Sequence, residues 1–199
     1  FLSDVQNWVG KEVKLLRSPK YDDIFDVFDK TGWLVGVGGA RCTTELKKKV
    51  RRDYQRENDI HVFGFTTDED ARIDRFSVGE PDLTCDWLLR DAGITKSACY
   101  RIIKDAGIAL PSMYLLGYKN NNCIGCVKGG AGYWNKIRND FPESFERMAQ
   151  QERKMGVTIN KSYAGDGLRK GVFLDELLPS AGRFESEPDI ECGVLCIGS

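Results

Sequence analysis

The sequence predicts an α/β fold, because helical and strand-like patterns alternate through the first third of the chain. Apolar residues recur at helical spacing in residues 1–9 and 21–29, and a basic helix is expected over residues 43–57. Residues 12–16 and 60–66 have the short apolar patterns that are typical of strands. Strands that alternate with helices indicate a sheet with crossover connections.

Helices dominate the rest of the predicted fold. The spacing of apolar residues predicts helices over residues 94–106, with Ile102 facing inward, over 131–139 and over 142–155. The last of these begins with Pro-Glu, which suits the first turn of a helix. Further along, only residues 172–178 are apolar enough to dock on a core.

Length and composition indicate one globular domain. The 199 residues fit a single domain, divided into an α/β region at 1–110 and a helical, cysteine-bearing region at 111–199. The net charge of −1 gives no general attraction to nucleic acids or to anionic membranes. The sequence contains no apolar run of membrane-spanning length, and its first residues lack the pattern of a signal peptide. A cytoplasmic location is therefore expected.

Histidine and the aromatic residues give weaker signals. His61 is the only histidine and lies at the edge of an expected strand, so a structural role is expected and a histidine-based triad is excluded. Tyr133 and Trp134 have the spacing of core residues, although stacking on an adenine base stays open.

The seven cysteines carry most of the chemical information. Cys85 and Cys99 lie in apolar surroundings and are expected in the core. Cys123 and Cys126 form a CxxC motif whose turn is eased by Gly125. Two thiols at this spacing can bind one metal ion or one edge of a cluster, or form a redox pair, or have no special role.

A second pair of cysteines, Cys192 and Cys196, lies close to the end of the sequence. Together with the CxxC motif these residues supply four thiols, enough for a tetrahedral zinc ion or a 4Fe-4S cluster. Cys42 is a further candidate, because Arg41 and Lys47 are cations that favour its thiolate form. Five cysteines thus compete for four positions.

Four segments occur in the order found in one known family: residues 41–47, residues 61–72, the CxxC motif, and Glu191-Cys192-Gly193-Val194. They resemble the sulfonucleotide reductases of the PP-loop family, and residues 115–155 look especially like the phosphoadenosine-phosphosulfate (PAPS) reductase-like proteins of phages and bacteria. The resemblance implies a Rossmann-like parallel sheet of the adenine nucleotide alpha-hydrolase-like type, N-terminally truncated.

The chain also departs from the family pattern. The S-G-G-K-D-S loop that cradles phosphates is absent, and Phe1 matches the family only after its second strand has begun. Roughly 40 to 50 residues, enough for a β-α-β unit, are therefore expected to be missing. Thr66 lies near the position where the family has an arginine, and Cys42 is a single cysteine where the cluster-binding members have a pair. Cys196 replaces the histidine of the family's C-terminal motif or lies just past it.

The resemblance implies a role for each matching residue. Cys192 would be the nucleophile that attacks the sulfur of PAPS or adenylyl sulfate, leaving an S-sulfonate that thioredoxin or glutaredoxin reduces to sulfite. Lys47, Arg72 and Arg41 would bind the substrate anion. The ligands of a 4Fe-4S cluster would be Cys42, Cys123, Cys126 and Cys196.

Alternative functions follow from the same residues. With Cys192 in place of Cys42, the four thiols would hold a structural Zn²⁺, and the chain would be a non-catalytic binding module. A further alternative is ATP-dependent sulfur transfer to DNA or tRNA, in which ATP and a nucleic acid would be the partners.

Overall fold

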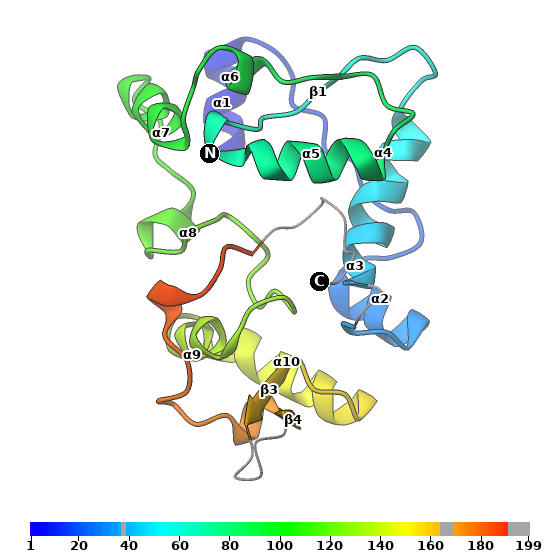
Figure 1. Cartoon of the computed structure of the whole chain (residues 1–199), viewed down its shortest axis with the longest axis vertical. Helices are drawn as coiled ribbons and strands as arrows, with labels where there is room; N and C mark the ends of the chain where they lie inside the picture. The colour runs from blue at the N-terminus through cyan, green and yellow to red at the C-terminus, as the bar shows by residue number, and fades with distance from the viewer. Residues whose placement is uncertain (37–38, 164–168, 191–199) are drawn as a thin grey trace. The chain divides into compact units, whose positions relative to one another are not determined.

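The computed structural model describes residues 1–36, 39–163 and 169–190 (Figure 1). This part of the chain is mixed α/β, with about half of its residues in helices and with short strands. Two compact units divide it: Phe1–Arg17 with Lys49–Asn121, and Ser18–Lys48 with the described residues from Asn122 onward. No helix among the described residues is both long and apolar enough to cross a membrane.

The first unit is built around a two-stranded parallel sheet. Strand β1 pairs with β2 in a register that places His61 opposite Cys85 and Val62 opposite Asp86. The elements of this unit are α1 (Leu2–Val9), α4 (Lys49–Tyr54), β1 (His61–Val62), the 3₁₀ helix η2 (Thr67–Glu69), α5 (Asp70–Gly79), β2 (Cys85–Asp86), α6 (Leu88–Asp91), α7 (Lys96–Asp105) and α8 (Ser112–Leu115).

Aromatic residues form the core beside this sheet. Phe65 and Phe76 are buried together with Ile73, and Phe63 and Trp87 pack against them. The rings of Phe63 and Phe76 are 4.6 Å apart, which is within the range of favourable aromatic contacts. The helices after β1 start at a capping box, in which Thr66 and Glu69 satisfy each other's backbone N–H groups.

Three expectations for this unit are wrong in part or in whole. Residues 12–16 form no strand, because no neighbouring strand among the described residues pairs with them. The strand expected over 60–66 is reduced to two residues, and Val62 is 58% exposed because one face of β1 is uncovered. Helix α7 confirms the helix expected over 94–106, but Ile102 faces solvent and is 43% exposed.

The second unit is mainly helical. Its elements are α2 (Ile24–Thr31), α3 (Arg41–Thr43), the π-helical segment η1 (Thr44–Lys48), α9 (Ala131–Asp140), α10 (Pro142–Met155), β3 (Asn160–Tyr163), β4 (Arg169–Val172) and the 3₁₀ helices η3 (Leu174–Glu176) and η4 (Phe184–Ser186). Strands β3 and β4 form an antiparallel hairpin, and the expected helices over 131–139 and 142–155 are confirmed. The predicted mixed α/β class is therefore observed, while the Rossmann-like sheet stays a prediction.

Helices α2, α9 and α10 enclose the core of this unit. Phe28, Trp134, Ile137 and Met148 are almost completely removed from solvent. Trp134 thus has the core position that its spacing predicts. On the surface, Arg147 of α10 lies 3.6 Å from the centre of the Phe25 ring of α2. Helices far apart in the sequence are held together at this point.

The segment after the hairpin docks through Glu152, a completely buried carboxylate on α10. Its two oxygens accept hydrogen bonds from the backbone N–H groups of Ile159 at 2.5 Å and Leu174 at 2.6 Å. Leu174 and Leu177 are buried, which confirms that the apolar stretch at 172–178 docks on the core. Burial raises the pKa of Glu152, although these hydrogen bonds favour its ionised form.

Candidate functional site

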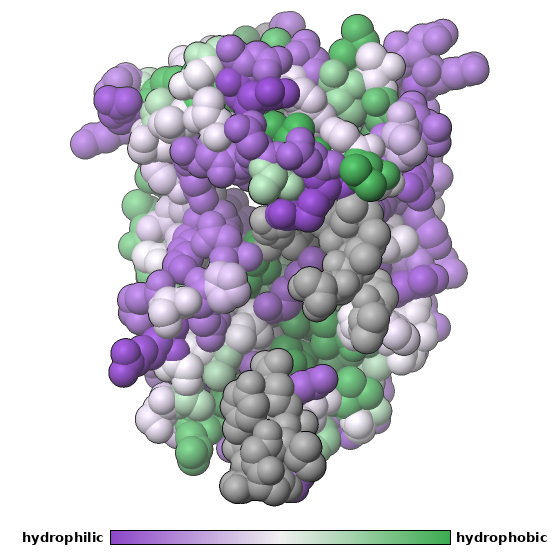
Figure 2. Space-filling view, in the orientation of Figure 1, coloured by the Kyte–Doolittle hydropathy of each residue, from purple (hydrophilic) through white to green (hydrophobic). Residues whose placement is uncertain are grey.

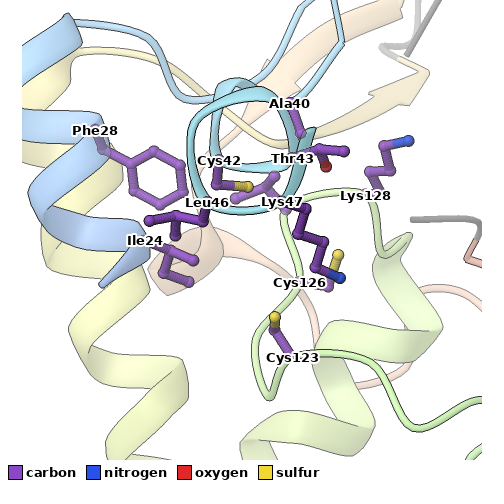
Figure 3. A pocket seen from close by; sticks show the side chains of 11 residues that line it. Ile24, Phe28, Ala40, Cys42, Thr43, Leu46, Lys47, Cys123, Cys126 and Lys128 are labelled. Atoms are coloured by element: carbon purple, nitrogen blue, oxygen red, sulfur yellow. The ribbon is translucent and has the colours of Figure 1, made fainter. Parts of the chain in front are cut away.

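Three cysteines of the second unit line one pocket (Figure 3). Cys42 comes from the start of the helical run after Ala40, whereas Cys123 and Cys126 come from the loop before α9. Figure 3 shows Lys47 extending from the helix toward Cys126. The cavity measures about 40 Å³, and its other lining residues are Ile24, Phe28, Ala40, Thr43, Leu46, Val127 and Lys128.

A π-helical segment places Cys42 and Lys47 on the same wall of this pocket. Residues Thr44–Lys48 form hydrogen bonds of the i→i+5 type, which bring side chains five positions apart onto one face. In a regular α-helix, the i and i+4 positions would share that face instead. Arg41 forms an ion pair with the buried carboxylate of Glu45, and the Nε atom of Arg41 lies 3.1 Å from Glu45 Oε1.

The hydroxyl of Tyr133 holds the loop that carries the CxxC motif. It accepts a hydrogen bond from the backbone N–H of Cys126 at 3.0 Å and donates one to the carbonyl of Cys123 at 3.1 Å. Gly125 lies between the two cysteines with a φ of 72°, a left-handed conformation that glycine adopts without strain. The ring of Tyr133 is buried, and burial strongly raises the pKa of its phenol, so the group stays protonated.

Glu187 fixes the N-terminus of α9, on which Tyr133 lies. Its carboxylate accepts hydrogen bonds from the N–H groups of Gly132 at 2.5 Å and Tyr133 at 3.2 Å. These donors have no partner within the helix, and a negative charge is favourable at this end. The start of α9 and the segment around Gly182 approach each other so closely that both need glycine. A Cβ atom added at Gly132 or at Gly182 would overlap the backbone of the opposite segment.

The last described segment, residues 178–190, runs along α9 and ends beside the CxxC loop. Asn135 donates hydrogen bonds to the carbonyls of Leu178 at 2.9 Å and Ala181 at 2.8 Å, so this segment follows α9. Asn122, immediately before the first cysteine of the motif, then donates to the carbonyl of Ile190 at 2.9 Å. Ile190 is therefore bound directly beside the CxxC motif.

The structure brings together four of the residues singled out from the sequence: Cys42, Cys123, Cys126 and Lys47 line the same pocket. Cys192 and Cys196 lie outside the described residues. Arg41 is engaged by Glu45, as described above, and is not among the lining residues.

Arg72, the third expected substrate ligand, belongs to the first unit. Its Nη1 lies 2.5 Å from Glu69 Oε1, and its guanidinium group lies 4.8 Å from the centre of the Phe65 ring. These contacts support the start of the helix that follows β1. Its predicted role in substrate binding stays a prediction.

Cys85 and Cys99 are set apart from the site by their environment. Both belong to the first unit, and burial raises the pKa of each thiol. Cys85 packs against the aromatic core. Thiols of this kind stay protonated and react slowly. Both cysteines are half-buried, and α7, which carries Cys99, has no buried residue, so a core position is not observed for Cys99.

Two residues of the site, Lys128 and Glu187, were missed from the sequence, and Tyr133 was considered only for its ring and not for its hydroxyl. Lys128 follows the CxxC motif by two positions, so its place in the pocket could have been expected from chain proximity alone. Tyr133 reads as a core residue, since its spacing does not show the use of its hydroxyl. Glu187 lies 54 positions after Tyr133, and no local pattern marks that contact.

The set of side chains in the pocket has the chemistry of a metal or cluster site. Thiols are the usual ligands of iron-sulfur clusters and of structural zinc, and Lys47, which extends toward Cys126 in Figure 3, can balance the negative charge of metal-bound thiolates. Three thiols line the pocket, but no three His, Cys, Asp or Glu side chains within the described ranges gather closely enough to form a metal-ligand group. The donor types therefore fit a metal centre that needs a further ligand and a closer approach of the thiols.

Comparisons with known proteins identify no relative of this chain. No family model matches the chain, and no significant match is found among curated proteins or among solved structures.

Proposed function

We propose that the chain is a PAPS reductase-like oxidoreductase that uses cysteine thiols to reduce a sulfonucleotide to sulfite and an adenosine nucleotide. The observation that carries this proposal is the convergence of Cys42, Cys123 and Cys126 with Lys47 on one pocket. These residues come from two distant segments that were both singled out by resemblance to sulfonucleotide reductases. A Rossmann-like sheet belongs to the same proposal.

In this proposal Cys42, Cys123 and Cys126, with Cys196, are the ligands of an iron-sulfur cluster. Such a cluster would supply a local charge that polarises the sulfate end of the substrate. The protein's own residues hold the loop in place through Tyr133 and supply a cation through Lys47.

The size of the cavity limits how a substrate can approach. Pockets that enclose a drug-sized ligand measure about 300 to 1,000 Å³, whereas this cavity measures about 40 Å³. A nucleotide cannot fit inside it. The sulfate group alone would reach the cations at the pocket, and the nucleotide would bind elsewhere.

Cys192 is the proposed nucleophile, and the binding of Ile190 beside the CxxC motif supports it. Two residues of chain span at most about 7 Å, so a nucleophile two positions after Ile190 is compatible with this contact. Its thiolate would attack the sulfur of the substrate, the S–O bond would break, and the nucleotide would leave with the oxygen. A dithiol reductant such as thioredoxin or glutaredoxin would then attack Cys192 Sγ, release sulfite and end as a disulfide.

Mass spectrometry of the protein incubated with PAPS or adenylyl sulfate tests this reaction. An S-sulfonate on Cys192, absent in Cys192→Ser, is the expected result, and adduct formation in that variant would overturn the assignment. Lys47→Ala should weaken substrate binding about tenfold through loss of a charged contact. Lys104→Ala, which removes an exposed lysine of α7, is the matched control.

A structural zinc site is the second candidate, and the small cavity favours it. A single ion needs far less space than a cluster of four irons and four sulfides. In this case Cys192 would be a ligand in place of Cys42, and the chain would be a non-catalytic binding module. Zinc content that survives Cys42→Ser but is lost in Cys123→Ser would identify this arrangement.

A further inference from the structure

The start of the first unit leaves its apolar residues uncovered. Helix α1 has no buried residue, and Phe1, Leu2, Trp8 and Val9 are all exposed. These residues recur at helical spacing, so one face of α1 is apolar and open to solvent. By contrast, the face of the chain drawn in Figure 2 is mostly hydrophilic. Apolar residues that gather on a surface in this way mark a site of interaction.

The segment after α1 has the pattern of a strand but no strand to pair with. In residues 12–16, Val13 and Leu15 alternate with charged residues, and Leu15 is 63% exposed. The N–H of Val13 donates to a glutamine side chain of α1 at 3.0 Å, and the Lys14 ammonium lies 4.7 Å from the centre of the Tyr54 ring. These contacts hold the segment on the first unit without joining it to the sheet.

Strand β1 has a free edge that such a segment could extend. The N–H groups of His61 and Phe63 donate to carbonyls of the β2 segment at 2.8 and 3.2 Å. Because backbone groups alternate in direction along a strand, those of Val62 point away from β2. Within the described ranges the sheet has no third strand on that side. Ile60 and Val62 are more than half exposed on the same strand, so its outer face is uncovered as well.

The charges of the two elements are complementary. Residues 11–17 carry three cations and one carboxylate. Residues 56–59, which precede β1, and residues 82–86, which include β2, together carry four carboxylates and one guanidinium group. Opposite net charges on two surfaces steer their association and suppress wrong pairings.

A second copy of the chain fits this surface better than a lipid membrane does. A membrane surface offers no strand to pair with the backbone groups of Val62, and the carboxylates beside the sheet repel anionic headgroups. We propose that two copies of the chain form a symmetric dimer in which residues 12–16 of each copy add to the β1 edge of the other. This exchange buries Val13 and Leu15 against Ile60 and Val62.

Sedimentation equilibrium of the full chain tests the proposal, with a reductant present so that no disulfide links two copies. A reversible dimer is expected. Val62→Lys places a charge on the strand edge, and Leu15→Pro removes a strand N–H, so each should weaken dimerisation at least tenfold. Both positions are exposed in the single chain, so folding should be kept. Val78→Lys, at a 79% exposed position of α5, is the control and should dimerise as the unaltered chain does.

A mixture of the two variants distinguishes the exchange from other contacts between copies. A dimer of one Val62→Lys copy and one Leu15→Pro copy keeps one intact strand contact, so the mixture should associate more tightly than either variant alone. A chain that stays monomeric at all concentrations, a dimer unaffected by both substitutions, or a mixture no tighter than its components would each overturn the proposal. A monomer that binds vesicles of phosphatidylglycerol would also overturn it, and would assign the surface to a membrane.

Discussion

The hydroxyl group of Tyr133 accepts a hydrogen bond of 3.0 Å from the backbone N–H of Cys126. The same hydroxyl donates to the carbonyl of Cys123, so one buried side chain closes the loop that holds two thiols of the pocket. Because Glu187 fixes the start of the helix that carries Tyr133, the loop geometry depends on a contact between distant parts of the chain.

Removal of this hydroxyl should loosen the CxxC loop without unfolding the chain. Tyr133→Phe leaves the Cys126 N–H without its partner, which should lower the free energy of unfolding by about 1 to 2 kcal/mol. Groups that position metal ligands typically change affinity 10- to 100-fold, so metal retention against a chelator should fall by about tenfold. Tyr114→Phe, in the first unit, is the control. Unaltered metal retention in Tyr133→Phe would show that the hydroxyl does not position the thiols.

Loss of the Glu187 carboxylate should destabilise the second unit. Glu187→Ala removes two hydrogen bonds and a favourable charge at the N-terminus of α9, so denaturant unfolding should show a loss of about 1 to 2 kcal/mol. Glu185→Ala removes an exposed carboxylate two positions away and should cost less than about 0.5 kcal/mol. Equal losses in the two variants would contradict the capping role.

The buried Glu152 predicts a pH dependence. Burial raises its pKa in the folded state, so the folded chain holds this proton more tightly than the unfolded chain. The stabilising contribution is complete below the ordinary pKa of glutamate and is lost as the pH rises through the raised value. The free energy of unfolding of Glu152→Gln relative to the unaltered chain should therefore be higher at pH 7 than at pH 5. Glu146→Gln, at an exposed position of the same helix, should show no such change.

Thiol reactivity should follow exposure and burial. In protein treated with a chelator, iodoacetamide should modify Cys123 first among the described cysteines, because it alone of these is exposed. Cys85 and Cys99 should react slowly, since burial raises the pKa of both thiols. Peptide mass spectrometry over time measures the order, and modification of Cys99 before Cys123 would contradict the structure.

Much of the local structure could be predicted from the sequence. Helix α10 was predicted with its observed bounds, because Pro142 marks its start and apolar residues follow its inner face. The strands were predicted poorly, since a parallel pair such as His61 and Cys85 forms only when distant segments meet. The exposed face at Val62 could not be anticipated from an apolar pattern that normally indicates burial.

The candidate site could be predicted in its residues but not in its construction. Cys123 and Cys126 were singled out by their spacing, Cys42 by its cationic neighbours, and Lys47 as a substrate ligand through resemblance; all four line the pocket. The π-helical turn that aligns Cys42 with Lys47 has no sequence signature. The hydrogen bonds from Tyr133 to the CxxC loop could not be predicted either, because they depend on tertiary contacts.

Metal analysis tests the central claim most directly, namely the proposal that the thiols lining the pocket ligate an iron-sulfur cluster. Protein purified without oxygen should be brown and contain about four irons and four sulfides per chain. Serine substitution of Cys42, Cys123 or Cys126 should each reduce the iron content severely, whereas Cys99→Ser should not. One zinc ion and no iron, or iron content that is unchanged in all three variants, would contradict the claim.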